Sequence, residues 1–328
     1  MSESLGAAVS SGTAPPDTPD PLPRPLSAQR VLPLRHPGRW ILTAVVLVLV
    51  AQIVHGLASN PFYQWDRFQY WFVRPVILDG LLITLEVAVY SALLGLLGGI
   101  LLALARLSKS PVLRAASWVY IWLFRSVPLI VVLLFLYNFS ALYPSLSIGV
   151  PFGPAFVRFD ESKLATDLVI AVVGLSLNEA AYAAEVVRAG ILSVDQGQQE
   201  AAAALGLPKR YQFARIVFPQ ALRAIIPSYV NQLIGLVKST SLVFYVSLLD
   251  LFGSVQSMGS TYPGDIVPLL LVATVWYVIL TSVVSVVQYY VERHYSRGAL
   301  RTVPPTPLQK LRAGARDLRV RLQRETVL

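Results

Sequence analysis

Polar side chains with possible chemical roles interrupt an apolar segment in the middle of the chain, at Asn178, Glu179, Tyr182 and Glu185. In a helix, positions 178, 182 and 185 share one face, and Glu179 sits beside that face. Ionisable groups at bilayer depth are costly, so each needs a partner or a function. A carboxylate there could hold an ammonium group or another cation, but the side chains could equally satisfy one another between helices.

Basic side chains also fall within or beside apolar segments. Arg188 follows Glu185 by less than one helical turn, so we predict that these two form a structural ion pair. Arg125 and Lys238 lie in two other apolar segments and are further candidates for polar contacts. Glu86 could face either a polar path or a neighbouring helix, and the sequence leaves that choice open.

The elements that must position these residues are membrane spans. Of the 328 residues, 55% are hydrophobic and 14% are charged, against about 25% charged in soluble domains. Backbone groups in the bilayer core must be satisfied internally, so each long apolar block predicts a helix. We therefore predict an all-α polytopic membrane protein with six transmembrane helices, in which Gly95 and Gly99 allow close packing. The predicted blocks are Trp40–Leu57, Ile77–Ala105, Ala115–Tyr137, Ala165–Val187, Ala224–Val246 and Ile266–Val291.

The distribution of Lys and Arg predicts the orientation of the spans. These residues are concentrated in segments 106–114 and 188–223 and after Val291, whereas segment 247–265 has none. By the positive-inside rule, both termini are then cytoplasmic. Alternatively, Gly56-Leu57-Ala58 is a signal-peptide cleavage site, which would remove the first helix and leave five spans.

Both ends of the chain have compositions unlike the spans. Residues 1–39 are rich in Pro and Ser and predict a disordered cytoplasmic tail before the extra N-terminal helix at 40–57. Residues 299–328 carry a leucine stripe among many arginines, which predicts a basic amphipathic cytoplasmic tail on anionic lipid; disorder is the alternative there.

Several function classes lack the residues they need. The chain has no cysteine and three scattered histidines, so we expect no metal site. It contains no G-x-x-x-x-G-K-[ST] loop and no evident catalytic constellation, so we expect it not to be an enzyme and to bind no cofactor itself. The net charge of +9 suits an anionic membrane face; no basic soluble domain is present to bind nucleic acid.

The basic segment 196–221 predicts a structure of its own. An alanine-rich run from Glu200 to Leu205 favours a short helix, and Gly206 and Pro208 end it. A second helical stretch then leads to Pro219. The small side chains would let this loop enter a groove on another protein, although an ordinary amphipathic surface helix would have a similar composition.

The 196–221 loop resembles the EAA motif of ABC-importer permeases. Glu200, Ala201 and Ala202 are followed at the motif's spacing by Gly206 and then by Ile216 and Pro219, with Phe218 where leucine is usual. The resemblance implies that the loop is a coupling helix that docks on a separate ATPase. The implied contact residues are Gln198, Glu200, Ala201, Ala202, Gly206 and Leu207.

The resemblance extends over residues 77–298, as a five-helix permease core. The segments LSLNEAAYAAEVVRAGILSVDQGQQE, FRSVPL and NQLIGLVKSTSL look like those of polar amino-acid importers of the histidine/glutamine/arginine type. The resemblance implies an importer permease in a bacterial-type cytoplasmic membrane. Its implied partners are an ATPase dimer that uses ATP and Mg, an extracytoplasmic amino-acid-binding protein and a second permease copy. The substrate path would include Asn178, Glu179, Tyr182, Arg125 and Lys238.

Two other readings remain beside this one. An ion-gradient-driven secondary transporter of a small polar solute would use intramembrane carboxylates and show an internal repeat, which we do not see. An intramembrane enzyme would need a buried catalytic pair, and none is apparent. The sequence does not name the amino acid, and it leaves open whether the two permeases are identical.

Overall fold

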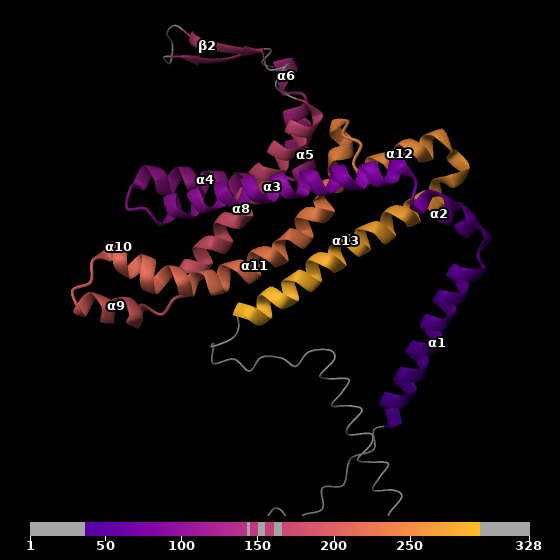
Figure 1. Ribbon diagram of the computed structural model, residues 1–328, viewed down its shortest axis with the longest axis horizontal. Coiled ribbons are helices and arrows are strands. Elements are labelled where there is room, and N and C mark those ends of the chain that lie inside the picture. Colours follow the sequence, from indigo (N-terminus) through magenta and orange to yellow (C-terminus); the bar gives the residue numbers. More distant parts are fainter. Residues whose placement is uncertain (1–36, 143–144, 150–154, 161–165, 296–328) are drawn as a thin grey trace, which may run out of the picture. The chain divides into compact units, whose positions relative to one another are not determined.

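The computed structural model describes residues 37–142, 145–149, 155–160 and 166–295 (Figure 1). The chain divides into two compact units, residues 1–60 and residues 61–328. The first unit contains one described helix, α1 (Pro37–Ser59). The predicted basic tail at 299–328, and the predicted disordered tail at 1–39 except for its last residues, lie outside the described residues.

The prediction of a helical, multi-spanning membrane protein is confirmed. Four helical stretches are long and apolar enough to cross a bilayer, and two bent helix pairs raise the number to six if each pair is one span. The continuous stretches contain α1, α3 (Pro75–Leu107), α8 (Asp167–Leu192) and α13 (Ile266–Tyr295). The bent pairs join α4 (Pro111–Ser126) to α5 (Leu129–Tyr137), and the stretch Lys209–Val246 to α12 (Leu251–Thr261).

Shorter elements connect these helices. A two-stranded antiparallel hairpin, which the sequence did not predict, lies in the segment between α6 and α8. The connecting elements are η2 (Pro61–Tyr63), α2 (Trp65–Phe72), α6 (Phe139–Leu142), β1 (Ser145–Gly149), β2 (Ala155–Asp160), α9 (Gln196–Ala204), α10 (Lys209–Gln212), the π-helical η3 (Phe213–Val217), α11 (Phe218–Ser239), η4 (Thr240–Val246) and η5 (Pro263–Asp265).

The third predicted span is not one straight helix. Its two parts, α4 and α5, meet at an angle of 101°. Pro128 explains the break, because proline disfavours helical geometry at the residue before it and cannot donate a backbone hydrogen bond. Val127 accordingly has an extended backbone, with φ −83° and ψ 130°. The break leaves the end of α4 and the start of α5 beside α8.

The fifth predicted span is also extended by an element that the sequence did not predict. After α11, the chain continues as η4 and then forms α12, in a segment that looked like a simple connection. Asp250 caps α12 by accepting a hydrogen bond from the Gly253 amide at 2.8 Å. The same buried carboxylate accepts hydrogen bonds from Thr84 (3.3 Å) and Tyr277 (3.1 Å), so it ties α12 to α3 and α13.

Close packing between α3 and α8 forms the centre of the second unit. A Cβ atom on Gly99 would lie 2.5 Å from the Cβ of Ala183, and one on Gly95 would lie 2.5 Å from the Cγ of Glu179. These distances are too short for real atoms, so a side chain at either position would force its neighbours on α8 to move. The prediction that Gly95 and Gly99 serve helix packing is confirmed.

We expect Gly99→Ala to destabilise the protein. The added methyl group would overlap Ala183, and overpacking of this kind typically costs about 1–3 kcal/mol. The matched control is Gly235→Ala on α11, because no atom lies within 4 Å of the position of its added Cβ. Thermal unfolding in detergent should show a midpoint lower by about 4 °C or more for Gly99→Ala than for the control. Equal midpoints for the two variants would show that the α3–α8 contact accommodates the added methyl group without loss of stability.

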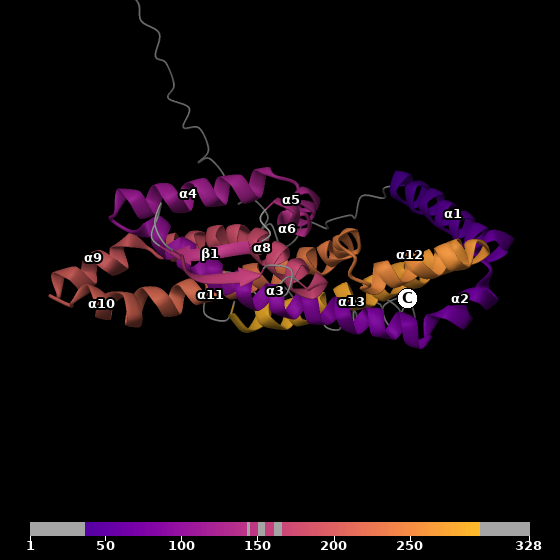
Figure 2. The same ribbon diagram turned by 90° about the horizontal axis from the view of Figure 1, so that it is seen from above.

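The second unit has two distinct ends. Both views place α9 and α10 at one end of the helical body and α2 and α12 at the other (Figures 1 and 2). A small apolar cluster joins the two ends of the segment that contains α9 and α10 to α3, α8 and α11. The cluster consists of Ala103, Val187, Val194, Val217, Ala221 and Ile225.

Candidate functional site

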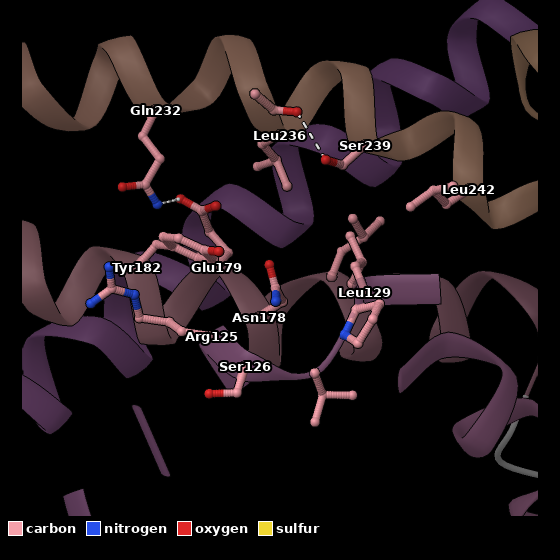
Figure 3. A pocket seen from close by; sticks show the side chains of 14 residues that line it. Arg125, Ser126, Leu129, Asn178, Glu179, Tyr182, Gln232, Leu236, Ser239 and Leu242 are labelled. Atoms are coloured by element: carbon pink, nitrogen blue, oxygen red, sulfur yellow. Dashed lines mark hydrogen bonds between the residues drawn. The ribbon is translucent and has the colours of Figure 1, made fainter. Parts of the chain in front are cut away.

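A cavity of about 420 Å³ lies where the break between α4 and α5 faces α8 and α11 (Figure 3). We call it the Glu179 cavity. It brings together four of the residues that the sequence singled out and adds polar side chains from α11. Its polar lining consists of Arg125, Ser126, Asn178, Glu179, Tyr182, Gln232 and Ser239.

Glu179 is the acidic group of this cavity. Its side chain extends from α8 toward α11, where Oε1 accepts a hydrogen bond from Gln232 Nε2 at 2.6 Å (Figure 3). The residue is only 5% exposed, and Gly95 of α3 lies directly behind its side chain. Tyr229 of α11 is a second polar neighbour of this carboxyl group. A carboxylate can accept several hydrogen bonds, so acceptor capacity remains for a ligand.

Arg125 and Tyr182 supply a cationic and aromatic group on the same cavity. The guanidinium carbon of Arg125 lies 5.3 Å from the centre of the Tyr182 ring, which is within the range of a cation–π contact. Both side chains are exposed to the cavity, and they come from the last turn of α4 and the middle of α8. A buried acid and an exposed guanidinium therefore face one space, which suits a ligand that carries both charges.

Asn178 has a contact that favours a positioning role. Its Nδ2 donates a hydrogen bond to the backbone oxygen of Phe124 at 2.9 Å. Phe124 lies in the last turn of α4, where backbone carbonyls have no partner within the helix. The tie fixes the end of α4 to α8 and so holds Arg125 at the cavity.

Glu185 and Arg188 lie in direct contact one turn further along α8. Arg188 donates from Nη2 at 2.7 Å and from Nε at 3.1 Å to the same carboxylate oxygen of Glu185. Both side chains are partly buried. This geometry agrees with the structural pair that their spacing predicts.

Lys238 lies away from these residues. The structure places it in a different cavity, of about 380 Å³, together with Tyr277 and other residues of α13. The helix turns by about 100° per residue, so the face of α11 that carries Gln232, Gly235 and Ser239 to the Glu179 cavity directs Lys238 elsewhere. Lys238 therefore does not join the predicted group. Glu86, left open by the sequence, is exposed on α3 and lines neither of these two cavities.

Gln232 is the site residue that sequence reasoning missed. The sequence contains a pattern that could have identified it. Gln232, Gly235 and Ser239 follow the i, i+3, i+7 spacing of one helix face in an apolar segment. An uncharged side chain drew less attention than Lys238, although Gln232 makes the direct contact to Glu179.

The 196–221 loop has the helix, break and second helix that the sequence predicts. Asp195 caps α9 by accepting a hydrogen bond from the Gly197 amide at 2.7 Å. At the other end, the amide of Leu207 donates to the Ala202 oxygen at 3.2 Å, and that of Gly206 donates to the Ala203 oxygen at 3.0 Å. This pair of bonds is the Schellman motif, which requires a left-handed residue; Gly206 has φ +71°.

The predicted coupling residues divide between two faces of this loop. Ala202 is buried at 3% exposure and faces the rest of the protein. Gln198, Glu200, Ala201 and Gly206 are exposed, and Leu207 is partly buried. No atom lies within 4 Å of a Cβ built on Gly206, so the surface around the break is open. The loop thus offers one face to its own helices and another to solvent.

Comparison with known proteins links this arrangement to a transport family. Residues 95–297 match the family model described as binding-protein-dependent transport system inner membrane component. The arginine transport system permease protein ArgU of Corynebacterium glutamicum is 39% identical over 292 residues, which cover 88% of this chain and 89% of that protein. The glutamate/aspartate import permease protein GltK of Escherichia coli O157:H7 is 35% identical, covering 70% of this chain and 99% of that protein.

Solved structures show the same similarity. The crystal structure of an amino acid ABC transporter with histidines has a chain that matches with a TM-score of 0.58 and 28% identity, covering 67% of this chain and 94% of that chain. An inward-facing structure of the MetNI methionine ABC transporter matches with a TM-score of 0.51 and 20% identity, covering 69% of this chain and 96% of that chain. The second likeness concerns the fold alone.

Proposed function

Because this chain belongs to the family of binding-protein-dependent transport system inner membrane components, we propose that it forms the translocation path of an ATP-driven importer for polar amino acids. It is a multi-pass inner membrane protein. In such transporters a separate subunit hydrolyses ATP, and the permease subunits bind no cofactor themselves. A secondary transporter, the alternative that the sequence left open, does not fit this family.

The Glu179 cavity supports the assignment to amino acids. A free amino acid carries an ammonium and a carboxylate, and this cavity offers Glu179 to the first and Arg125 to the second. Gln232 holds the Glu179 carboxylate in place, and Tyr182 supports the guanidinium. The presence of both charges on one cavity is the observation that carries this proposal.

The 196–221 loop supports coupling to the ATPase. Its exposed residues Gln198, Glu200, Ala201 and Gly206, with the partly buried Leu207 beside them, form the surface that would dock on the partner. Ala202 faces inward and would instead hold α9 on the permease. Since the apolar cluster at Val217 and Ile225 joins this loop to α8 and α11, a push on α9 would reach the helices of the Glu179 cavity.

The arrangement of the assembly completes the proposal. The second permease subunit is a copy of this chain or a related one, since a central path between two subunits needs two permeases. The Lys and Arg distribution favours both termini on the cytoplasmic side, with α9 and α10 toward the ATPase.

Transport by the reconstituted assembly tests this function. We expect the full chain, purified with its associated subunits and supplied with the binding protein, to accumulate a polar amino acid in proteoliposomes only when ATP is enclosed. Arginine is the first substrate to assay, with glutamate and aspartate beside it, because similar permeases are named for arginine and for glutamate/aspartate. Uptake that needs an ion gradient and proceeds without ATP would contradict the proposal.

A further inference from the structure

A second cavity of about 420 Å³ adjoins the Glu179 cavity. Arg125, Ser126 and Tyr182 line both, so the two spaces meet at these side chains. We call the second space the arginine cavity, after Arg106, Arg125 and Arg188, which line it together with Glu185. Nothing in the proposed function yet uses this second space.

The two cavities follow one another along α8. The Glu179 cavity contacts α8 from Leu175 to Tyr182, and the arginine cavity contacts it from Tyr182 to Arg188. At about 1.5 Å per residue, this succession covers roughly 20 Å of the helix. The arginine cavity is the one nearer the end of α8 that leads into α9, and Arg106 lies in the last turn of α3. It therefore lies on the side of the 196–221 loop.

The charges of the two cavities differ. The arginine cavity has three guanidinium groups and one carboxylate, that of Glu185, which is already bound by Arg188. Among the residues that the structure describes, no acidic side chain pairs with Arg106 or Arg125. The cavity thus holds two guanidinium groups that are available to an anion, and a guanidinium binds a carboxylate through a matching pair of donors.

The walls of the arginine cavity include two tryptophans. Trp118 and Trp122 stack one turn apart on α4, with ring centres 6.2 Å apart and an angle of 10° between the rings. Their side chains are 49% and 56% exposed. Flat indole surfaces beside guanidinium groups suit a ligand with an anionic end and an aliphatic body.

We propose that the arginine cavity is an exit subsite that binds the carboxylate of the transported amino acid after it leaves the Glu179 cavity. This inference rests on the proposed function. Arg125 reaches both cavities and so keeps hold of the carboxylate while the ammonium group leaves Glu179. Arg106 then provides the second guanidinium, and Trp118 and Trp122 cover the aliphatic part. Occupation of this subsite from the cytoplasmic side opposes further uptake.

Inhibition of uptake by enclosed amino acid tests the subsite. In proteoliposomes of the full importer, amino acid enclosed with ATP should inhibit uptake of labelled amino acid from outside. Arg106→Gln should raise the half-inhibitory internal concentration roughly tenfold, since it removes one charge-assisted contact. The half-inhibitory internal concentration for Arg106→Lys should lie between those of the unmodified importer and Arg106→Gln. Arg114→Gln is the matched control, because Arg114 lines neither cavity.

A second ligand identifies the group that is bound. The amine made by removing the carboxylate from the same amino acid should not inhibit from inside. Equal inhibition by the amine, an unchanged half-inhibitory concentration in Arg106→Gln, or no inhibition of the unmodified importer would each overturn the proposal. If Arg106→Gln changes transport only in vesicles that contain anionic phospholipid, and leaves inhibition unchanged, the cavity binds a lipid phosphate and the proposal is wrong.

Tryptophan fluorescence provides a measurement that does not depend on Arg106 variants. Adding amino acid to the purified complex should change the emission of Trp118 and Trp122, and the Trp118→Phe/Trp122→Phe double variant should lose that change. An unaltered change in the double variant would contradict the subsite. Failure of the unmodified complex to show ATP-driven uptake would contradict the proposed function itself, whereas normal uptake with unaltered inhibition contradicts the exit subsite alone.

Discussion

Glu179→Gln is expected to reduce uptake of the amino acid about tenfold or more. The substitution keeps the size of the side chain and leaves Gln232 an oxygen to donate to, but it replaces the buried carboxyl group that faces the cavity with an amide that cannot carry a charge. A hydrogen bond to a charged group contributes roughly 1.5–3 kcal/mol, and each 1.4 kcal/mol is about a factor of ten in binding. The loss should appear in the concentration dependence and rate of ATP-driven uptake.

A matched acidic control separates this effect from a general loss of charge. Glu86→Gln removes a carboxylate that is exposed on α3 and lines neither the Glu179 cavity nor the arginine cavity. It should transport as the unmodified chain does, and both variants should retain their associated subunits. Unchanged affinity and rate in Glu179→Gln would remove Glu179 from the substrate path.

Gly206→Val is expected to reduce the amount of ATPase that co-purifies with the permease roughly tenfold. Gly206 has φ +71°, which a β-branched residue adopts only at a cost of about 1–2 kcal/mol or more. The open space around it excludes a steric clash as the cause. The strain would act on the Schellman motif and so change the direction in which the chain leaves α9.

Two further substitutions at position 206 divide backbone strain from surface charge. Asparagine tolerates the left-handed conformation, so Gly206→Asn should retain most of the ATPase. Gly206→Asp keeps that tolerance but adds a charge to the docking face, and we expect it to weaken the attachment. If valine and asparagine behave alike, the backbone conformation at Gly206 is not what the partner needs.

Local signals made several features predictable from the sequence. The loop between α8 and α11 is dictated by an alanine-rich run, a glycine and a proline, and each acts within a few residues of itself. The spacing of Asn178, Tyr182 and Glu185 depends only on the helical repeat. These features needed no knowledge of distant residues, and the structure contains them.

The bend between α4 and α5 shows where local signals end. Pro128 indicates a break, but apolar residues continue on both sides of it, and prolines are tolerated in membrane helices. The 101° angle depends on contacts with α8, such as the hydrogen bond from Tyr120 to the Leu177 oxygen at 2.9 Å. A hydropathy pattern contains no information on such tertiary contacts. The sequence therefore predicted one span where the structure has two helices.

Helix rotation and distant capping account for the other differences. The burial of Leu236 and Val237 fixes which way α11 faces, and this rotation separates Lys238 from Glu179. α12 was missed because its segment is rich in glycine and serine. Its first amide, on Leu251, donates at 3.0 Å to Thr84, a residue 167 positions earlier in the chain. Neither fact can be read from periodicity alone.

The contact between Gly95 and Glu179 has an evolutionary consequence. A methyl group at Gly95 would collide with the side chain of Glu179 and push the acid toward α11, although Gly95 itself does not line the cavity. Substrate preference can therefore change through a mutation at a residue of a neighbouring helix that does not contact the transported solute. A comparison of two such importers that considers only the residues lining the cavity would miss this change, because the substituted residue lies behind the lining residues.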